Sequence, residues 1–262
     1  MHLDIRELTT FYASPLGRVT RRIIARKLRQ QWRRASGETL ISLGFGVPYL
    51  GSFRGEVRRL GALMPAGQGA VIWPAGGPVN TVLVDEERLP LADNSVDKLL
   101  AVHCLELSEH ARPLLREMWR VLAPEGRLLM IVPNRHGLWT RREHTPFGQG
   151  QPYSRNQLER LLTGAFFVPT TWSTALHALP FSHPLAVRWS VGLEDVGGRL
   201  WPRLGGVIFV EARKEVSLVI PSGGFAARSP QLKPAESIFS RRVRLSSEPA
   251  TADVPAEGTT TR

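Results

Sequence analysis

Short apolar runs alternate along the chain with longer stretches in which apolar residues recur every three or four positions. Short continuous runs are typical of buried parallel strands, whereas the three-to-four spacing is typical of amphipathic helices. The runs predict strands at 40–44, 69–73, 81–84, 96–102, 127–132, 166–176 and 205–212. Strands that alternate with helices in this way predict an α/β fold with a doubly wound, mostly parallel sheet.

The helical spacing predicts helices at 3–12, 16–34, 49–64, 113–122, 154–162 and 185–196. The helix at 16–34 has apolar residues such as Ile24 and Leu28 on one side and arginines on its other faces. A basic amphipathic helix of this kind suits contact with a membrane surface or a nucleic acid. It also suits a cover for the first strand, with its arginines in solvent, and we expect this second role.

The pattern divides the chain into three parts. Residues 1–36 form a basic helical segment, residues 37–220 form the domain with the predicted sheet, and residues 221–262 form a tail. The tail is rich in Ser, Pro, Ala, Thr and Arg, has few large apolar residues and shows no period. A segment of this composition cannot bury enough apolar surface to fold, so we expect it to be disordered.

The composition is basic, with 34 Lys and Arg against 23 Asp and Glu and a formal net charge of +11. This excess leaves nucleic-acid binding open, although arginine-rich proteins are often basic without such a role. The single cysteine, Cys104, excludes an intrachain disulfide and fits a reducing compartment. No apolar run is long enough to span a membrane, so we expect a cytoplasmic protein. The spacing of His, Cys and carboxylates indicates no metal site.

A glycine turn, Gly44-Phe45-Gly46, closes the first predicted strand. Glycine has no Cβ, so such a turn can bring backbone amides close to a ligand. In open α/β sheets, ligands bind in the crevice at the carboxyl ends of the strands. Two glycines after a buried strand also make an ordinary tight turn, so the glycines alone leave both interpretations open.

Three fragments together resemble the class I S-adenosylmethionine (SAM)-dependent methyltransferases. They are the glycine motif at 43–48, the stretch 85–97 that leads from the third strand into the fourth, and the helix-turn-strand element at 117–128. The resemblance is to the small-molecule, type 11 kind of these enzymes. It implies a Rossmann-like sheet of seven strands with an antiparallel last strand, and it implies SAM as the cofactor.

The resemblance also implies roles for single residues. The backbone of Gly44 and Gly46 would face the methionine part and the ribose of SAM. Asp85 would accept a hydrogen bond from the adenine amino group, and Glu86 would be the neighbouring backbone contact. His103 would border the transferred methyl group, which makes it the candidate catalytic residue. Asp85 as an ordinary surface carboxylate and His103 as a structural histidine stay open as alternatives.

The chain departs from the family pattern near the ribose. The family places Asp or Glu at the end of the second strand to bind both ribose hydroxyls, but residues 70–74 contain no acid. Residues 74–80 are also too few for the helix that the family places between the second and third strands. Pro48 stands where the family often has a third glycine. The fold is therefore better supported than the activity.

We expect a SAM-dependent methyltransferase that acts on a small molecule, with the loop at 135–153 over the substrate. Glu106 could assist as a general base, although a solvated carboxylate is its expected state. One alternative is a non-catalytic binding or regulatory protein that kept the fold, and another is a nucleic-acid methyltransferase or binder. The enzymatic interpretation needs an open crevice, because a crevice filled by the chain's own side chains would leave only the architecture.

Overall fold

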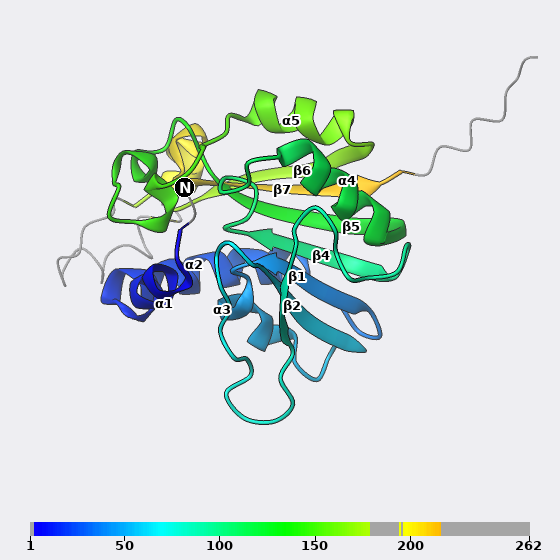
Figure 1. Ribbon diagram of the computed structural model, residues 1–262. Coiled ribbons are helices and arrows are strands. Elements are labelled where there is room, and N and C mark those ends of the chain that lie inside the picture. Colours follow the sequence, from blue (N-terminus) through cyan, green and yellow to red (C-terminus); the bar gives the residue numbers. More distant parts are fainter. Residues whose placement is uncertain (1–2, 179–193, 195, 216–262) are drawn as a thin grey trace, which may run out of the picture. The chain divides into compact units, whose positions relative to one another are not determined.

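A seven-stranded sheet with helices on both faces forms the fold (Figure 1). The computed structural model describes residues 3–178, 194 and 196–215. Its strands are β1 (Thr39–Gly44), β2 (Arg59–Pro65), β3 (Thr81–Val84), β4 (Val96–Val102), β5 (Leu122–Pro133), β6 (Phe167–Ala175) and β7 (Val207–Lys214).

The strand order is β3-β2-β1-β4-β5-β7-β6. The neighbours from β3 to β5 run parallel, and β7 is antiparallel to both β5 and β6. The predicted doubly wound, mostly parallel α/β sheet with an antiparallel last strand is confirmed. The order reverses between β1 and β4, and at such a reversal the two strands open a crevice at their carboxyl ends.

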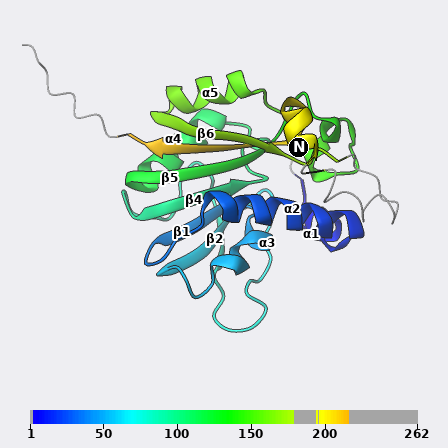
Figure 2. The same ribbon diagram turned by 180° about the vertical axis from the view of Figure 1, so that it is seen from behind.

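The helices are α1 (Ile5–Ala13), α2 (Pro15–Gln31), α3 (Val47–Leu50), α4 (Ala111–Val121) and α5 (Arg155–Gly164), with 3-10 turns η1 (Gly51–Phe53), η2 (Leu138–Arg141), η3 (Pro146–Gly148) and η4 (Pro202–Leu204). α1, α2 and α3 share one core with the sheet, and α4 and α5 share another, on the opposite face (Figures 1 and 2). Successive side chains of the central strands enter the two cores in turn, as Leu40 and Ile41 do. This explains why these strands are apolar throughout.

The basic helix α2 is a cover for the sheet, as we expected. Ser14 caps it, since its hydroxyl accepts a hydrogen bond from the Gly17 N–H at 3.0 Å, and Pro15 lies in the first turn. Ile24 and Leu28 are fully buried. The helix therefore places its apolar side in the core.

The second strand lies where the spacing predicts the end of a helix. The predicted helix at 49–64 is wrong beyond Phe53, because η1 ends there and Gly55, at a φ of +82°, takes part in the turn that leads to β2. The residues of β2 fit helical spacing, but they are also a continuous apolar run of strand length. Periodicity cannot separate these two cases in a short run.

The predicted strand at 69–73 is wrong for a related reason. β2 already occupies the place between β1 and β3. Residues 66–80 connect β2 to β3 without a helix, so the family's crossover helix is missing, as the sequence predicts. The predicted helix at 185–196 falls almost wholly outside the described residues, and the predicted tail at 221–262 falls wholly outside them.

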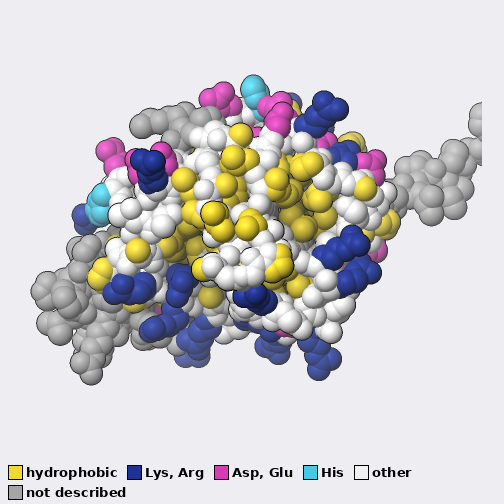
Figure 3. All heavy atoms as spheres, turned by 60° about the horizontal axis from the view of Figure 1, so that its bottom comes forward, with side chains coloured by type: hydrophobic (Ala, Val, Ile, Leu, Met, Phe, Trp, Pro, Cys, Tyr) yellow, Lys and Arg dark blue, Asp and Glu magenta, His cyan; other side chains and the backbone are white. Residues whose placement is uncertain are grey.

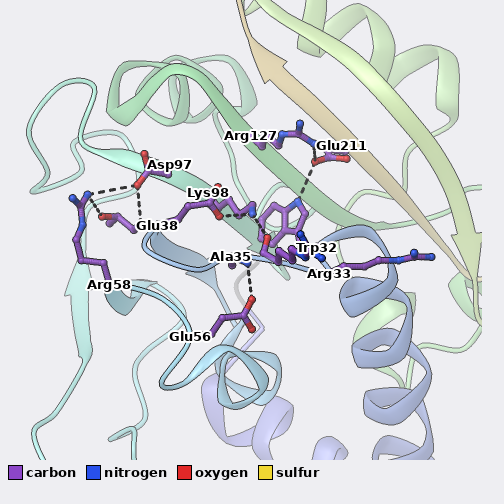
Figure 4. Close-up of polar contacts among 12 residues, drawn as sticks. Trp32, Arg33, Ala35, Glu38, Glu56, Arg58, Asp97, Lys98, Arg127 and Glu211 are labelled. Carbon is purple, nitrogen blue, oxygen red and sulfur yellow. Dashed lines mark hydrogen bonds and ion pairs between the residues drawn. The ribbon is translucent and has the colours of Figure 1, made fainter.

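A polar network ties the amino ends of the strands to the end of α2 (Figure 4). Lys98 on β4 is buried, and its Nζ donates to the Arg34 carbonyl at 2.7 Å and to the Glu38 carboxylate. Glu211 on β7 accepts from Trp32 Nε1 at 3.1 Å and from the Arg127 guanidinium at 3.2 Å. The buried charge of Lys98 is thus paired at this end of the sheet.

Candidate functional site

The glycine turn lies at the carboxyl end of β1 and is packed against the protein itself. Gly44 has a φ of +82°, and a Cβ there would lie 2.3 Å from the Val102 carbonyl oxygen. A Cβ on Gly46 would lie 2.5 Å from the Cβ of Ser42. Both glycines are therefore required by close approach within the fold, whether or not a ligand is bound.

His103 lies directly after β4, beside Gly44, as the sequence predicts for the crevice. Its side chain is only 1% exposed, and its backbone has a φ of +49°. Its Nε2 lies 2.9 Å from the Tyr12 hydroxyl, which in turn lies 2.8 Å from the Tyr49 hydroxyl. Burial raises the pKa of both phenols, so they stay protonated at neutral pH.

Glu106 completes this buried chain on the other side of His103. Its side chain is 1% exposed, and its Oε1 lies 3.2 Å from His103 Nδ1 without the alignment of a hydrogen bond. Neither carboxylate oxygen has a hydrogen-bond partner. An unbonded buried polar group costs about 1–3 kcal/mol, so this pair is a cost to the fold. The expectation of a solvated Glu106 is wrong.

Side chains from four segments fill the crevice around His103. Tyr12 of α1 packs on Phe45 with ring centroids 5.5 Å apart, and Phe147 packs on His103 at 5.0 Å. Gln68, from the loop after β2, reaches past the end of β1 and donates to the His103 carbonyl at 3.0 Å. In this conformation the chain's own side chains therefore fill the space around His103 that the enzymatic interpretation needs to be open.

Asp85 and Glu86 follow β3 at the same edge of the sheet. Asp85 is exposed, and its Oδ1 accepts from the Glu87 N–H at 3.0 Å. Glu86 accepts from the Ser108 hydroxyl at 2.5 Å, which places it beside the turn after β4. Burial, followed by the negative charges of Glu86 and Glu106, raises the pKa of the Cys104 thiol in that turn. Glu86 is thus close to the turn that carries His103, whereas Asp85 faces solvent.

The observed second strand, β2, also has no acid at its carboxyl end, where the family places the carboxylate that binds the ribose. β2 ends at Met64 and Pro65, and Gln68 is the polar residue that follows. Gln68 is 5% exposed, and its Oε1 has no hydrogen-bond partner. A neutral amide therefore stands near the place that the family gives to an acid.

Sequence reasoning missed the residues that close the crevice. Tyr12 and Tyr49 are separated from His103 by 91 and 54 positions, and the chain carries no motif that joins them. Trp139 and Phe147 fall in the loop that we expected over a substrate, but both are buried. The one available signal was a pair of aromatic residues, Phe11 and Tyr12, on a short helix before the first strand.

Two further searches were restricted to the described residues. No group of three or more His, Cys, Asp and Glu side chains is arranged there to hold a metal ion. Among the helices of those same ranges, none combines the length and the apolar character that a membrane span requires.

Comparison with known proteins agrees with the fold. A family described as "Methyltransferase domain" matches residues 66–130, a range that begins after the glycine turn. No curated protein sequence matches the chain.

Solved structures with this fold include several methyltransferases. A SAM-dependent methyltransferase from Thermotoga maritima, described as a possible histamine N-methyltransferase, is similar at a TM-score of 0.56 and 14% identity, over 80% of this chain and 96% of that one. A SAM-dependent methyltransferase from Mesorhizobium loti is similar at a TM-score of 0.52 and 14% identity, over 71% of this chain and 95% of that one. The [4+2]-cyclase SpnF is similar at a TM-score of 0.51 and 18% identity, over 74% of this chain and 80% of that one. At these identities the likeness concerns the fold alone.

Proposed function

We propose that the chain is a class I SAM-dependent methyltransferase that methylates a small-molecule acceptor. Its fold and the domain match over residues 66–130 support this proposal. Because a filled crevice by itself would leave only the architecture, the proposal requires a second conformation in which the crevice is open. Helix α1 must first withdraw Tyr12 from His103 and Phe45 before SAM can enter.

The observation that carries the proposal is the buried pair of His103 and Glu106. A protein that needed only the scaffold would gain stability by replacing an unbonded buried carboxylate with an apolar residue. Instead, two ionisable groups lie at the carboxyl end of β4, where open α/β sheets bind ligands. Their proximity supports a role for His103 next to the acceptor, with the Glu106 carboxylate as a charge beside its ring.

Binding of SAM and of S-adenosylhomocysteine, measured by calorimetry, tests the proposal. We expect weak binding to the natural chain, because the competent state is a minor one. Tyr12→Ala empties the crevice and should tighten binding about tenfold or more, whereas Tyr12→Phe keeps it filled and should change affinity little. Formation of S-adenosylhomocysteine with fractionated small molecules, and not with RNA or protein, would then identify the acceptor class.

A second candidate is a non-catalytic binding or regulatory protein with the methyltransferase fold. The same closure favours it, because Tyr12, Phe45 and Gln68 fill the crevice without a ligand. The absence of an acid after β2 favours it as well. If neither the natural chain nor Tyr12→Ala binds either nucleotide at millimolar concentration while both variants fold, methyl transfer is wrong and this candidate stands.

A further inference from the structure

β3 lies at the edge of the sheet, and within the described part of the chain no strand pairs with its outer side. The Asn80 carbonyl accepts a hydrogen bond from the Ala62 N–H at 2.8 Å and so points toward β2. Backbone groups of successive residues alternate in direction along a strand, so the N–H and C=O groups of Thr81 and Leu83 point away from β2. A row of free backbone groups of this kind can pair with another strand.

Apolar side chains on and beside β3 are exposed. Val82 and Leu83 are 48% and 53% exposed, whereas Val84 is buried in the core that contains residues of α4 and α5. Ile72 and Val79, in the connection that leads into β3, are 77% and 57% exposed. Figure 3 shows hydrophobic side chains gathered on the face that includes the bottom of Figure 1. We call Ile72, Val79, Val82 and Leu83, with the free side of the strand, the β3 edge.

The β3 edge is complementary to a second copy of itself that runs in the antiparallel direction. With a two-fold axis at Val82, Thr81 of each copy lies opposite Leu83 of the other. Opposite residues whose backbone groups face one another exchange both of their N–H···O bonds, so the free groups of Thr81 and Leu83 are all satisfied. The Asp85 carbonyl already accepts from the Arg88 N–H at 3.1 Å, so the pairing stops at the end of β3.

The charges at the two ends of β3 fit the same arrangement. At the amino end, Arg59 of β2 is exposed, and the Arg54 guanidinium lies beside Gly77 in the connection before β3. At the carboxyl end, the Asp85 side chain is exposed, and two glutamates follow it. In Figure 3 most Lys and Arg side chains lie below the apolar area and most Asp and Glu side chains lie above it. Antiparallel pairing places the arginines of each copy near the carboxylates of the other, whereas parallel pairing would bring like charges together.

The opposite edge of the sheet, β6, is protected against such pairing. Pro169 interrupts its backbone donors, and its register with β7 shifts between Pro169 and Thr171. Proline and bulges are devices that natural edge strands use against pairing. β3 has neither a proline nor a bulge nor a charged side chain in its four residues. The sheet is thus blocked at one edge and open at the other.

We propose that two copies of the chain pair through their β3 edges in an antiparallel, two-fold arrangement that joins the two sheets into one. The contact covers Val82 and Leu83 of both copies, which are exposed in the single chain. Because both copies contribute the same residues, the contact is closed and gives a dimer, not a filament. The proposal does not rest on SAM binding, because the β3 edge lies outside the crevice around His103.

Sedimentation velocity of the full chain at about 0.15 M salt tests the proposal. At this ionic strength the Debye length is about 8 Å, which screens the net charge of +11 on each copy more than it screens charges in contact. We expect a dimer at micromolar concentration. Leu83→Lys should raise the dissociation constant of the dimer about tenfold or more, because a lysine on an edge strand opposes pairing. Val168→Lys, at an exposed position of the protected β6 edge, is the matched control and should leave the dimer intact.

Charge reversal tests the direction of the pairing. Arg59→Glu and Asp85→Lys should each weaken the dimer about tenfold, because both ends of the contact then carry like charges. An equimolar mixture of the two variants should dimerise as the natural chain does, because each end of the mixed dimer again joins a positive to a negative side chain. Thermal unfolding of each variant checks that it folds.

Each of three results would overturn the proposal. The first is a natural chain that is monomeric at every concentration measured. The second is an equal effect of Leu83→Lys and Val168→Lys, because the contact would then lie elsewhere. The third is a mixture of Arg59→Glu and Asp85→Lys that is no more dimeric than either variant alone, because the antiparallel arrangement requires recovery.

Discussion

The two ends of the sheet differ in how they hold a buried carboxylate, Glu211 at the amino ends and Glu106 at the carboxyl ends. At the amino ends, Lys98 and Glu211 are bonded to named partners (Figure 4). At the carboxyl ends, both oxygens of Glu106 and the Oε1 of Gln68 have no partner. Each unbonded buried group costs about 1–3 kcal/mol, so the bonded Glu211 contributes to stability whereas the unbonded Glu106 reduces it. That difference agrees with the proposed function, because unbonded buried groups are expected where function limits stability.

The largest effect is expected from Gly44→Ala at the carboxyl end. The added methyl would meet the Val102 carbonyl at 2.3 Å in a left-handed backbone, so we expect a loss of about 4 kcal/mol in the free energy of unfolding. Gly37→Ala is the matched control, because Gly37 has a φ of +77° but no atom within 4 Å of the added carbon. It should lose only about 1 kcal/mol. Urea unfolding measures both losses. If Gly44→Ala and Gly37→Ala lose the same free energy of unfolding, the backbone conformation alone, and not the contact with Val102, requires glycine at position 44.

The next effect is expected at the amino end, from Lys98→Met. The change leaves the Glu38 carboxylate and the Arg34 carbonyl without their donor, and we expect a loss of about 3 kcal/mol. Arg127→Met removes a partner of Glu211 whose own side chain is 58% exposed, so it should cost less than about 1 kcal/mol. Urea unfolding measures both. If Lys98→Met is as stable as the natural chain, the contacts of Lys98 with Glu38 and Arg34 do not stabilise the fold.

A pair of carboxylate changes compares the two ends directly. Glu106→Gln removes a charge that has no hydrogen-bond donor, so stability should rise by about 1 kcal/mol. Glu211→Gln weakens the acceptor of Trp32 and Arg127, so stability should fall by about 1 kcal/mol. Thermal unfolding of the two variants decides the sign. Destabilisation of both would mean that Glu106 is bonded in solution, and the contrast between the two ends would be lost.

The smallest expected effect is on the stability of the protein at acidic pH. The backbone N–H of Ala35 and then the guanidinium of Arg29 hold the pKa of Glu56 below its ordinary value of 4.5. A lowered folded-state pKa gives stability above the ordinary value, and this stability is lost as the pH falls through the folded-state value. Glu56→Gln should therefore flatten the acid side of the profile of stability against pH. Superimposable profiles for the natural chain and the variant would contradict this role of Glu56.

Local pattern was enough for most of the sheet but not for its second strand. β3 and β4 lie where the runs 81–84 and 96–102 predict them, because short continuous apolar runs are typical of strands in a parallel sheet. β2 was mistaken for a helix because its run fits both periods, and only its pairing with β1 and β3 decides between them. The run at 96–102 predicts that His103 follows a strand, whereas its position beside Gly44 depends on the pairing of β1 with β4.

The sequence by itself determined the alternating elements and the basic cover helix, because periodicity and residue identity are local properties. For the same reason it determined that no acid stands where the resemblance would place the ribose. Only the tertiary structure decided that the Tyr12 hydroxyl lies within hydrogen-bond distance of His103, 91 positions away. It also decided that the Glu106 carboxylate is buried without a hydrogen-bond partner. It further decided that Val82 and Leu83 of β3 are exposed whereas Val84 is buried. These features depend on which distant surfaces meet when the sheet forms, and no local pattern carries that information.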